Sequence, residues 1–127
     1  MRILYSCPLD PQYAAAAGGH VISIVRELAR LGHTVTLIHM GRPIAELEGV
    51  RQIALARSIP HPARQIWRNV ALAYAVAKEW RSGNYDILYH RLEKSTFLPA
   101  VVAQARHIPL LVEVNSDLRS EPFVQQA

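Results

Sequence analysis

Cysteine is nearly absent from this sequence, and long apolar runs are missing altogether. Of the 127 residues only Cys7 carries a thiol, which excludes a disulfide scaffold and a cysteine-based zinc site and favours a reducing compartment. The longest wholly apolar run, Val70–Ala77, is far shorter than the roughly 18 residues of a membrane span. A signal peptide is not expected either, since Pro8 and Asp10 interrupt the short apolar stretch after Arg2. We therefore expect a cytoplasmic globular protein.

Acidic residues are missing between Gly49 and Lys78, although the formal net charge of the chain is only +4. The cations of this stretch are Arg51, Arg57, Arg64, Arg68 and Lys78. They could face phosphate, anionic lipid or nucleic acid, or form a solvated face that Glu46, Glu48 and Glu79 compensate. Nucleic acid is not expected as a partner, because no known module fits and aromatic residues do not interleave with the cations. Peripheral contact with a membrane stays open.

Strand-like and helix-like stretches alternate along the chain, which predicts one α/β domain over residues 1–127. We expect strands at 2–6, 35–39, 50–55, 86–90 and 110–114, and helices at 20–31, 63–81 and 96–106. Near-continuous apolar strands favour a parallel sheet covered on both faces, hence a Rossmann-like doubly wound fold. The first guess for the strand order is 3-2-1-4-5.

The long helix at 63–81 carries an apolar stripe that we expect to face the core. Its members are Ile66, Val70, Ala73, Ala77 and Trp80, spaced by four and three residues. Trp67 and Tyr74 flank the stripe, where they either widen the buried face or, with Arg64 and Arg68, form an interfacial patch against a membrane.

Ligands of doubly wound sheets bind beyond the carboxyl ends of the strands, and this rule selects the candidate site residues. They are Ser6, Cys7, His39, His90, Arg91, Asn115, Ser116 and Asp117. Glu113 is the exception within an otherwise apolar strand: it is either paired with a cation, for which Arg91 is the candidate, or close to a polar edge of the sheet. Cys7 has no evident base and is not expected to be a nucleophile. No histidine pair has the spacing of metal ligands, so no metal is expected.

Gly18 and Gly19 precede the first predicted helix, whose first residue would be His20. Two glycines there would let a phosphate approach the free N–H groups of the helix, or they merely permit the turn into it. The stretch lacks the Gly-x-Gly-x-x-Gly fingerprint, so NAD binding is not expected. It also lacks a Gly-Lys-Ser/Thr sequence, which excludes a Walker phosphate loop.

Three segments together resemble the N-terminal domain of a GT-B fold glycosyltransferase of the glycosyltransferase 4 family. They are residues 1–21, with the opening MRILYS and GGHV after a proline-bearing loop, residues 28–37 (LARLGHTVTL), and residues 85–115, with YDILYHR and PLLVEVN. This resemblance spans nearly the whole chain. It implies a hexosyltransferase-type enzyme with two Rossmann-like domains, whose N-terminal half receives the acceptor and whose C-terminal half holds a nucleotide-sugar.

The resemblance also implies roles for individual residues. Gly18 and Gly19 would lie against the donor phosphates, His20 near the acceptor, and Arg91 and Asp117 along the cleft. Many relatives have a histidine just after the fifth strand, where this sequence has Asn115. A retaining reaction, in which the donor's leaving phosphate takes the acceptor proton, tolerates Asn115 as a positioning group. No metal or other cofactor is implied beyond the nucleotide-sugar donor.

The nucleotide-sugar domain of that family has no counterpart in this sequence. We therefore expect a truncated domain, either a fragment or a stand-alone half, that is inactive alone and needs the other domain in cis or trans. The alternative hypothesis is a non-catalytic Rossmann-like module that binds an anionic ligand or a partner protein. Self-association through an open sheet edge also stays open.

Overall fold

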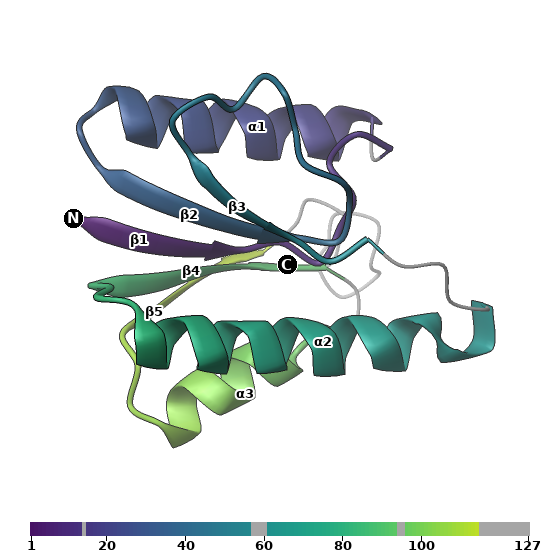
Figure 1. The fold of residues 1–127 in the computed structure, drawn as a ribbon. Helices are drawn as coiled ribbons and strands as arrows, with labels where there is room; N and C mark the ends of the chain where they lie inside the picture. Colours follow the sequence, from purple (N-terminus) through teal and green to yellow (C-terminus); the bar gives the residue numbers. More distant parts are fainter. Residues whose placement is uncertain (14, 57–60, 94–95, 115–127) are drawn as a thin grey trace, which may run out of the picture.

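The computed structural model describes residues 1–13, 15–56, 61–93 and 96–114 (Figure 1). Its strands are β1 Arg2–Ser6, β2 Thr34–His39, β3 Arg51–Ala54, β4 Ile87–Leu92 and β5 Leu110–Val114. Its helices are α1 Ala15–Arg30, α2 His61–Ser82 and α3 Leu98–Ala105. All strand pairs are parallel, and the order is β3-β2-β1-β4-β5. The predicted Rossmann-like sheet and its strand order are confirmed.

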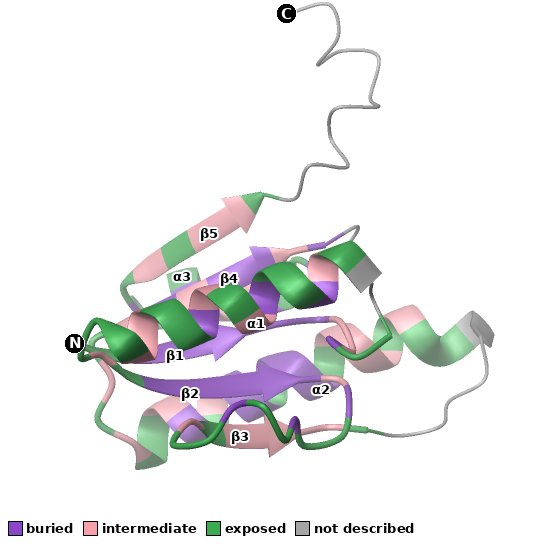
Figure 2. Ribbon diagram, turned by 90° about the horizontal axis from the view of Figure 1, so that it is seen from above, coloured by how far each residue is buried: buried purple, intermediate pink, exposed green. Residues whose placement is uncertain are grey.

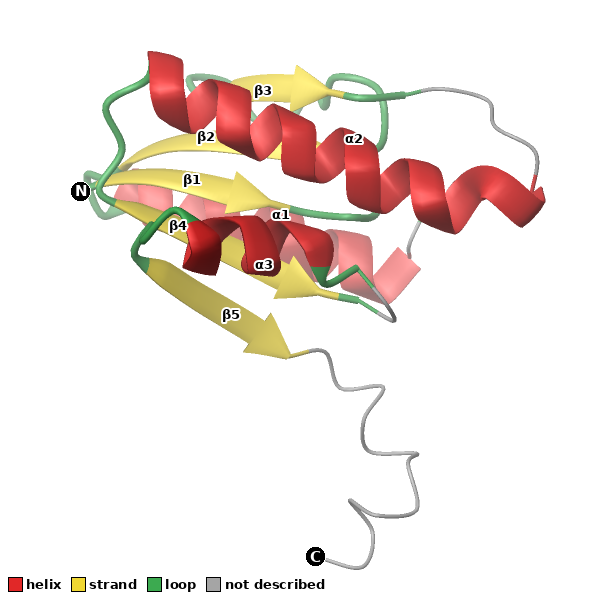
Figure 3. Ribbon diagram, turned by 90° about the horizontal axis from the view of Figure 1, so that it is seen from below, coloured by secondary structure: helices red, strands yellow, loops and turns green. Residues whose placement is uncertain are grey.

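The sheet is the middle of three layers, with α1 on one face and α2 and α3 side by side on the other (Figures 1 and 3). Because side chains alternate along a strand, neighbouring residues feed two separate cores. Tyr5 and Leu37 pack with Val25 beneath α1, whereas Leu4 and Leu88 pack beneath α2. The central strands β1 and β2 are largely buried, and the edge strand β5 is only half-buried (Figure 2).

Helix α1 begins at Ala15, earlier than the predicted start at His20, so that prediction was wrong. Alanine has the highest helix propensity, and the alanines before Gly18 extend the helix toward its N-terminus. Gly18 is tolerated there because it packs directly on the backbone of Pro11, where a side chain would not fit. At the other end Gly32 adopts a φ of +93°, as expected for a residue that ends a helix in the left-handed region.

The buried face of α2 matches the predicted stripe only in part. Ala73 is buried and Trp80 packs against the core, but two other members of the stripe are exposed. Ile66 is 69% exposed and Val70 is 50% exposed, whereas Leu72 and Val76 are fully buried. Alanines on both sides of the helix allow either face to approach the sheet closely. The spacing of apolar residues therefore does not decide which face is buried. Burial of Glu79 on the Leu72 side is balanced by Arg51 of β3, whose Nη1 lies 2.6 Å from Glu79 Oε1. This pair confirms that Glu79 compensates part of the basic stretch.

Helix α3 begins at Leu98, two residues later than predicted, because the N–H and the hydroxyl of Thr96 both donate back to the Glu93 carbonyl. The bond from the Thr96 hydroxyl to the Glu93 carbonyl is 2.6 Å long. Pro99 is the second residue of the helix, a position that suits proline, and it therefore favours a helix start at Leu98. None of the described helices is long and apolar enough to cross a membrane. All strands run in the same direction, so their carboxyl ends share one edge of the sheet with the start of α1.

Candidate functional site

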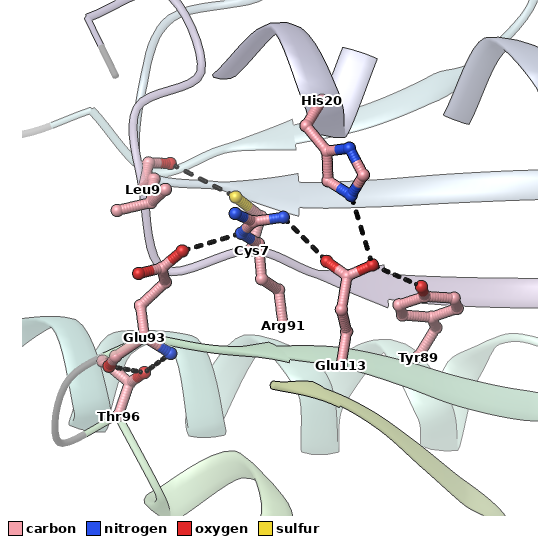
Figure 4. Close-up of polar contacts among 8 residues, drawn as sticks. All are labelled: Cys7, Leu9, His20, Tyr89, Arg91, Glu93, Thr96 and Glu113. Atoms are coloured by element: carbon pink, nitrogen blue, oxygen red, sulfur yellow. Dashed lines mark hydrogen bonds and ion pairs between the residues drawn. The ribbon is translucent and has the colours of Figure 1, made fainter. Parts of the chain in front are cut away.

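A cluster of polar side chains lies at the carboxyl ends of β4 and β5 (Figure 4). We call it the polar edge; it consists of His20, Tyr89, Arg91, Glu93 and Glu113. Tyr89, Arg91 and Glu93 follow one another at every second position and therefore lie on the same side of the chain. Arg91 pairs in register with Glu113 of the neighbouring strand, and His20 reaches the cluster from α1.

Arg91 is the centre of the polar edge, and its side chain is only 4% exposed. Its Nε donates to Glu93 Oε1 over 2.8 Å, and its Nη1 donates to Glu113 Oε1 over 2.7 Å. The predicted pairing of Glu113 with Arg91 is confirmed. Two carboxylates face one guanidinium, so these three groups carry one net negative charge. Arg91 is thus committed to holding both carboxylates in place.

Glu113 and His20 are the groups of the polar edge that a ligand can reach. Their side chains are 19% and 55% exposed, and His20 Nε2 lies 3.6 Å from Glu113 Oε2. The same oxygen accepts a hydrogen bond of 2.7 Å from the Tyr89 hydroxyl. Burial, together with this bond to Glu113, raises the pKa of Tyr89, which therefore remains a phenol and a donor. The exposed carboxylate can accept a hydrogen bond from a ligand hydroxyl.

The histidines at the strand ends are structural. His90 Nε2 donates to the Thr96 carbonyl over 2.8 Å, so its Nδ1 accepts from the Ser6 hydroxyl 3.1 Å away. His39 Nδ1 accepts from the Gly41 N–H over 3.1 Å. Both rings are fully buried, and burial lowers the pKa of each. These neutral rings tie loops to the sheet and leave no nitrogen free for a ligand.

Cys7 is fully buried as well. Its Sγ lies 3.8 Å from the Leu9 carbonyl, and burial raises the pKa of the thiol to about 12. A protonated, inaccessible thiol is not a nucleophile, in agreement with the prediction.

The two glycines have different surroundings. A Cβ on Gly18 would lie 1.8 Å from the Pro11 carbonyl oxygen, whereas a Cβ on Gly19 would meet nothing within 4 Å. Packing therefore explains Gly18, and the surface beside Gly19 is open. Gly19 is the fifth residue of α1 and lies beyond the first four N–H groups, which lack partners within a helix. The expected phosphate contact of both glycines stays a prediction.

The remaining predicted site residues, Asn115, Ser116 and Asp117, lie outside the described residues. Tyr89 and Glu93 were missed by the sequence reasoning, although a signal for them exists. Tyr89 and Arg91 lie on one face of β4, and Glu93, which follows the end of this strand at Leu92, continues the same alternation.

Comparison with known proteins gives one family match. The model of Glycosyltransferase Family 4 matches residues 17–125, a range that includes His20, Arg91 and Glu113. No curated protein matches the chain.

Several solved structures resemble the fold. A UGT transferase from Siraitia grosvenorii in complex with UDP is 19% identical, with a TM-score of 0.61 over 88% of this chain and 27% of that one. MurG from Acinetobacter baumannii is 10% identical, with a TM-score of 0.53 over 89% of this chain and 34% of that one. The C-terminal domain of a hydrogenase from Pyrococcus furiosus is 17% identical, with a TM-score of 0.62 over 88% of this chain and 89% of that one. At these identities the likeness concerns the fold, and the chain spans 27% of the UGT transferase and 34% of MurG.

Proposed function

The chain belongs to Glycosyltransferase Family 4, and from this membership we propose that it is the acceptor-side domain of a retaining, hexosyltransferase-type enzyme. The donor is a nucleotide-sugar, and a second domain, in the same chain or in another, holds it. The observation that carries the acceptor role is the polar edge, where the partly accessible carboxylate of Glu113 lies at the carboxyl end of β5 and the exposed imidazole of His20 lies beside it on α1.

In this proposal Glu113 binds the acceptor. Its carboxylate already accepts hydrogen bonds from Arg91 and Tyr89, which fix its orientation. An acceptor hydroxyl donates to the remaining lone pairs of Glu113, and His20 contacts the same sugar or polyol from α1. Arg91 is a positioning residue, because it acts on the acceptor only through Glu113.

The transfer itself needs no base from this domain. The acceptor oxygen bonds to the anomeric carbon while the bond from that carbon to the leaving phosphate oxygen breaks, and the phosphate oxygen takes the hydroxyl proton. The contribution of the polar edge is to hold the hydroxyl on the face of the sugar from which the phosphate departs. Gly19, at the open start of α1, and Asn115 and Asp117 are proposed to line the same cleft.

The test is transfer by the complete gene product, followed as nucleotide release from a panel of nucleotide-sugars and acceptors. Glu113→Gln and His20→Ala should each lower kcat/KM for the acceptor about 10- to 100-fold, mainly through KM. Glu27→Gln, on the exposed face of α1 away from the polar edge, is the matched control and should leave the rate unchanged.

Three results would contradict parts of the proposal. Unchanged kinetics in both polar-edge variants would contradict the assignment of the acceptor site. A product of inverted anomeric configuration, determined by NMR, would contradict the retaining mechanism. Micromolar binding of a nucleotide-sugar by residues 1–127 alone, measured by calorimetry, would contradict the assignment of the donor to the other domain.

A further inference from the structure

The two helical layers present very different surfaces to the outside. On α1 the exposed residues are polar or small, and charges of both signs alternate: Ala16, Gly19, His20, Ser23, Arg26, Glu27 and Arg30. Glu27 and Arg30 form an ion pair on this surface. This is the ordinary solvated face of an amphipathic helix. The opposite layer, made by α2 and α3, departs from that pattern.

Large apolar side chains are exposed together on α2 and at the start of α3. Their exposed fractions are 69% for Ile66, 50% for Val70, 68% for Tyr74, 54% for Phe97, 36% for Leu98 and 52% for Val101. The two helices lie side by side in the same layer (Figure 3). A shallow groove of about 380 Å³ between them is lined by Ile66, Val70, Phe97, Leu98 and Val101, so these residues form one continuous patch.

A second groove borders the patch on the other side of α2. It has a volume of about 510 Å³, runs between α2 and the edge strand β3, and shares Val70 with the first groove. Most of its lining is apolar, with Tyr74, Trp67 and Ile53 among its large members, and its polar lining residues are Arg51, Lys78, Glu79 and Ser82. The exposed side of α2 is therefore a ridge of apolar side chains between two apolar grooves.

Among the described residues of α2 and α3, the exposed charged side chains have a single sign. They are the cations Arg64, Lys78 and Arg81 of α2, and Arg106 directly follows α3. The sequence of α2 contains one acidic residue, Glu79, which is buried and paired with Arg51, and the sequence of α3 contains none. We call this surface, with its apolar residues and cations, the α2–α3 face.

We propose that the α2–α3 face docks on an anionic lipid bilayer. Exposed bulky apolar side chains with cations alone beside them are the combination that holds a helix in the interface of an anionic membrane. Charge complementarity favours this occupant over a second copy of the chain, since self-pairing would bring the cations of α2 against one another. The breadth of the patch, over two parallel helices, also suits an extended surface.

Docking in this way would not block the polar edge. The N-terminal end of α2 points toward the same end of the molecule as the carboxyl ends of the strands (Figure 1). A membrane beneath α2 and α3 would therefore leave that edge open and near the lipid surface. The inference rests on the α2–α3 face and does not require the proposed function.

The test is co-sedimentation of the complete gene product with vesicles of phosphatidylcholine, with and without about 30% phosphatidylglycerol. We expect binding to the anionic vesicles only, weakened by added salt. Val70→Asp combined with Tyr74→Asp should reduce the partition coefficient at least about 30-fold, and Lys78→Glu combined with Arg81→Glu should do the same. All four positions are exposed, so the fold should persist, which circular dichroism and the melting temperature check.

Matched controls lie on α1 and at its end. Ser23→Asp with Leu31→Asp, and Arg26→Glu with Arg30→Glu, repeat the same kinds of charge change on exposed residues of the opposite layer. They should bind nearly as well as the unmodified protein. The proposal is overturned if the protein does not bind anionic vesicles or binds neutral vesicles equally well. It is also overturned if the α1 variants lose as much binding as the variants of the α2–α3 face. A dimer of the unmodified protein that the Val70→Asp, Tyr74→Asp variant no longer forms, measured by analytical ultracentrifugation, would overturn it as well.

Discussion

Arg91 holds two carboxylates that would otherwise repel each other at the carboxyl edge of the sheet. Its guanidinium is buried, and Glu93, also buried, has only 7% of its side chain exposed. Removing one partner of such a pair leaves uncompensated charge in a poorly solvated place. The sequence indicated half of this arrangement, because a carboxylate within an apolar strand demands a cation. That Glu93, which follows the end of β4, shares the same cation could be seen only in the tertiary structure.

We expect Arg91→Ala to lower the free energy of unfolding by about 3 kcal/mol. Urea denaturation followed by circular dichroism measures this. Arg30→Ala, which breaks the exposed pair with Glu27, should have no measurable effect. Equal stabilities of the Arg91 variant and the unmodified protein would mean that Glu93 and Glu113 do not depend on Arg91 for their burial.

His39 and His90 should make the fold sensitive to acid. Burial lowers the pKa of both rings in the folded protein, so the unfolded chain binds protons first as the pH falls. The free energy of unfolding should therefore be constant above about pH 7 and decline below the unfolded histidine pKa of about 6.5. Denaturation curves across this range measure the decline. The decline should be unchanged in His107→Asn, at an exposed position with a φ of 55°. In His90→Gln the decline should be smaller. A stability that is independent of pH in this range would contradict the neutral, buried rings.

At the scale of the elements, the start of α1 depends on a contact between the helix and the loop after β1. The sequence identifies Gly18 and Gly19 as a pair, yet only Gly18 is in contact with Pro11. Propensity alone cannot distinguish them, because the distinction is made by a segment that the chain folds back onto the helix. The same holds for α2, whose buried face was predicted only in part, because its sheet neighbours, and not its own periodicity, selected Leu72 and Val76.

Alanine at these two positions should have opposite effects. Gly19→Ala is expected to raise the free energy of unfolding by roughly 0.5–1 kcal/mol, since alanine favours the helix and its Cβ meets open space. Gly18→Ala should lower it by about 1–3 kcal/mol, because its Cβ would overlap the Pro11 carbonyl. Thermal unfolding of both variants measures the difference. Similar melting temperatures would mean that the loop at Pro11 moves away from the new Cβ without destabilising the fold.

At the scale of the whole molecule, stability should be greatest in the middle of the sheet. Strands β1, β2 and β4 each have a strand neighbour on both sides. Their residues Leu4, Leu37 and Leu88 are fully buried. The outer strands β3 and β5 have one neighbour each.

Native-state hydrogen exchange should therefore be slowest at the amides of Leu4, Leu37 and Leu88, close to the rate set by global unfolding. The amides of β3 and β5 should exchange faster through local opening. NMR of the protein in deuterated buffer measures both. Protection in β5 as high as in β1 would indicate that something covers the β5 edge.

The sequence by itself determined the alternation of strands and helices and the doubly wound sheet, and it indicated a cation as one possible partner of Glu113. These follow from local periodicity, chain connectivity and the cost of burying a charge. The strand order was a first guess that the structure confirmed. Only the tertiary structure decided which polar groups remain accessible: His39 and His90 became buried supports, while Glu113 and His20 stayed within reach of a ligand. It also decided that α2 exposes Val70 and Tyr74. The physical reason is that accessibility depends on which distant segments pack together, and local pattern does not encode that choice.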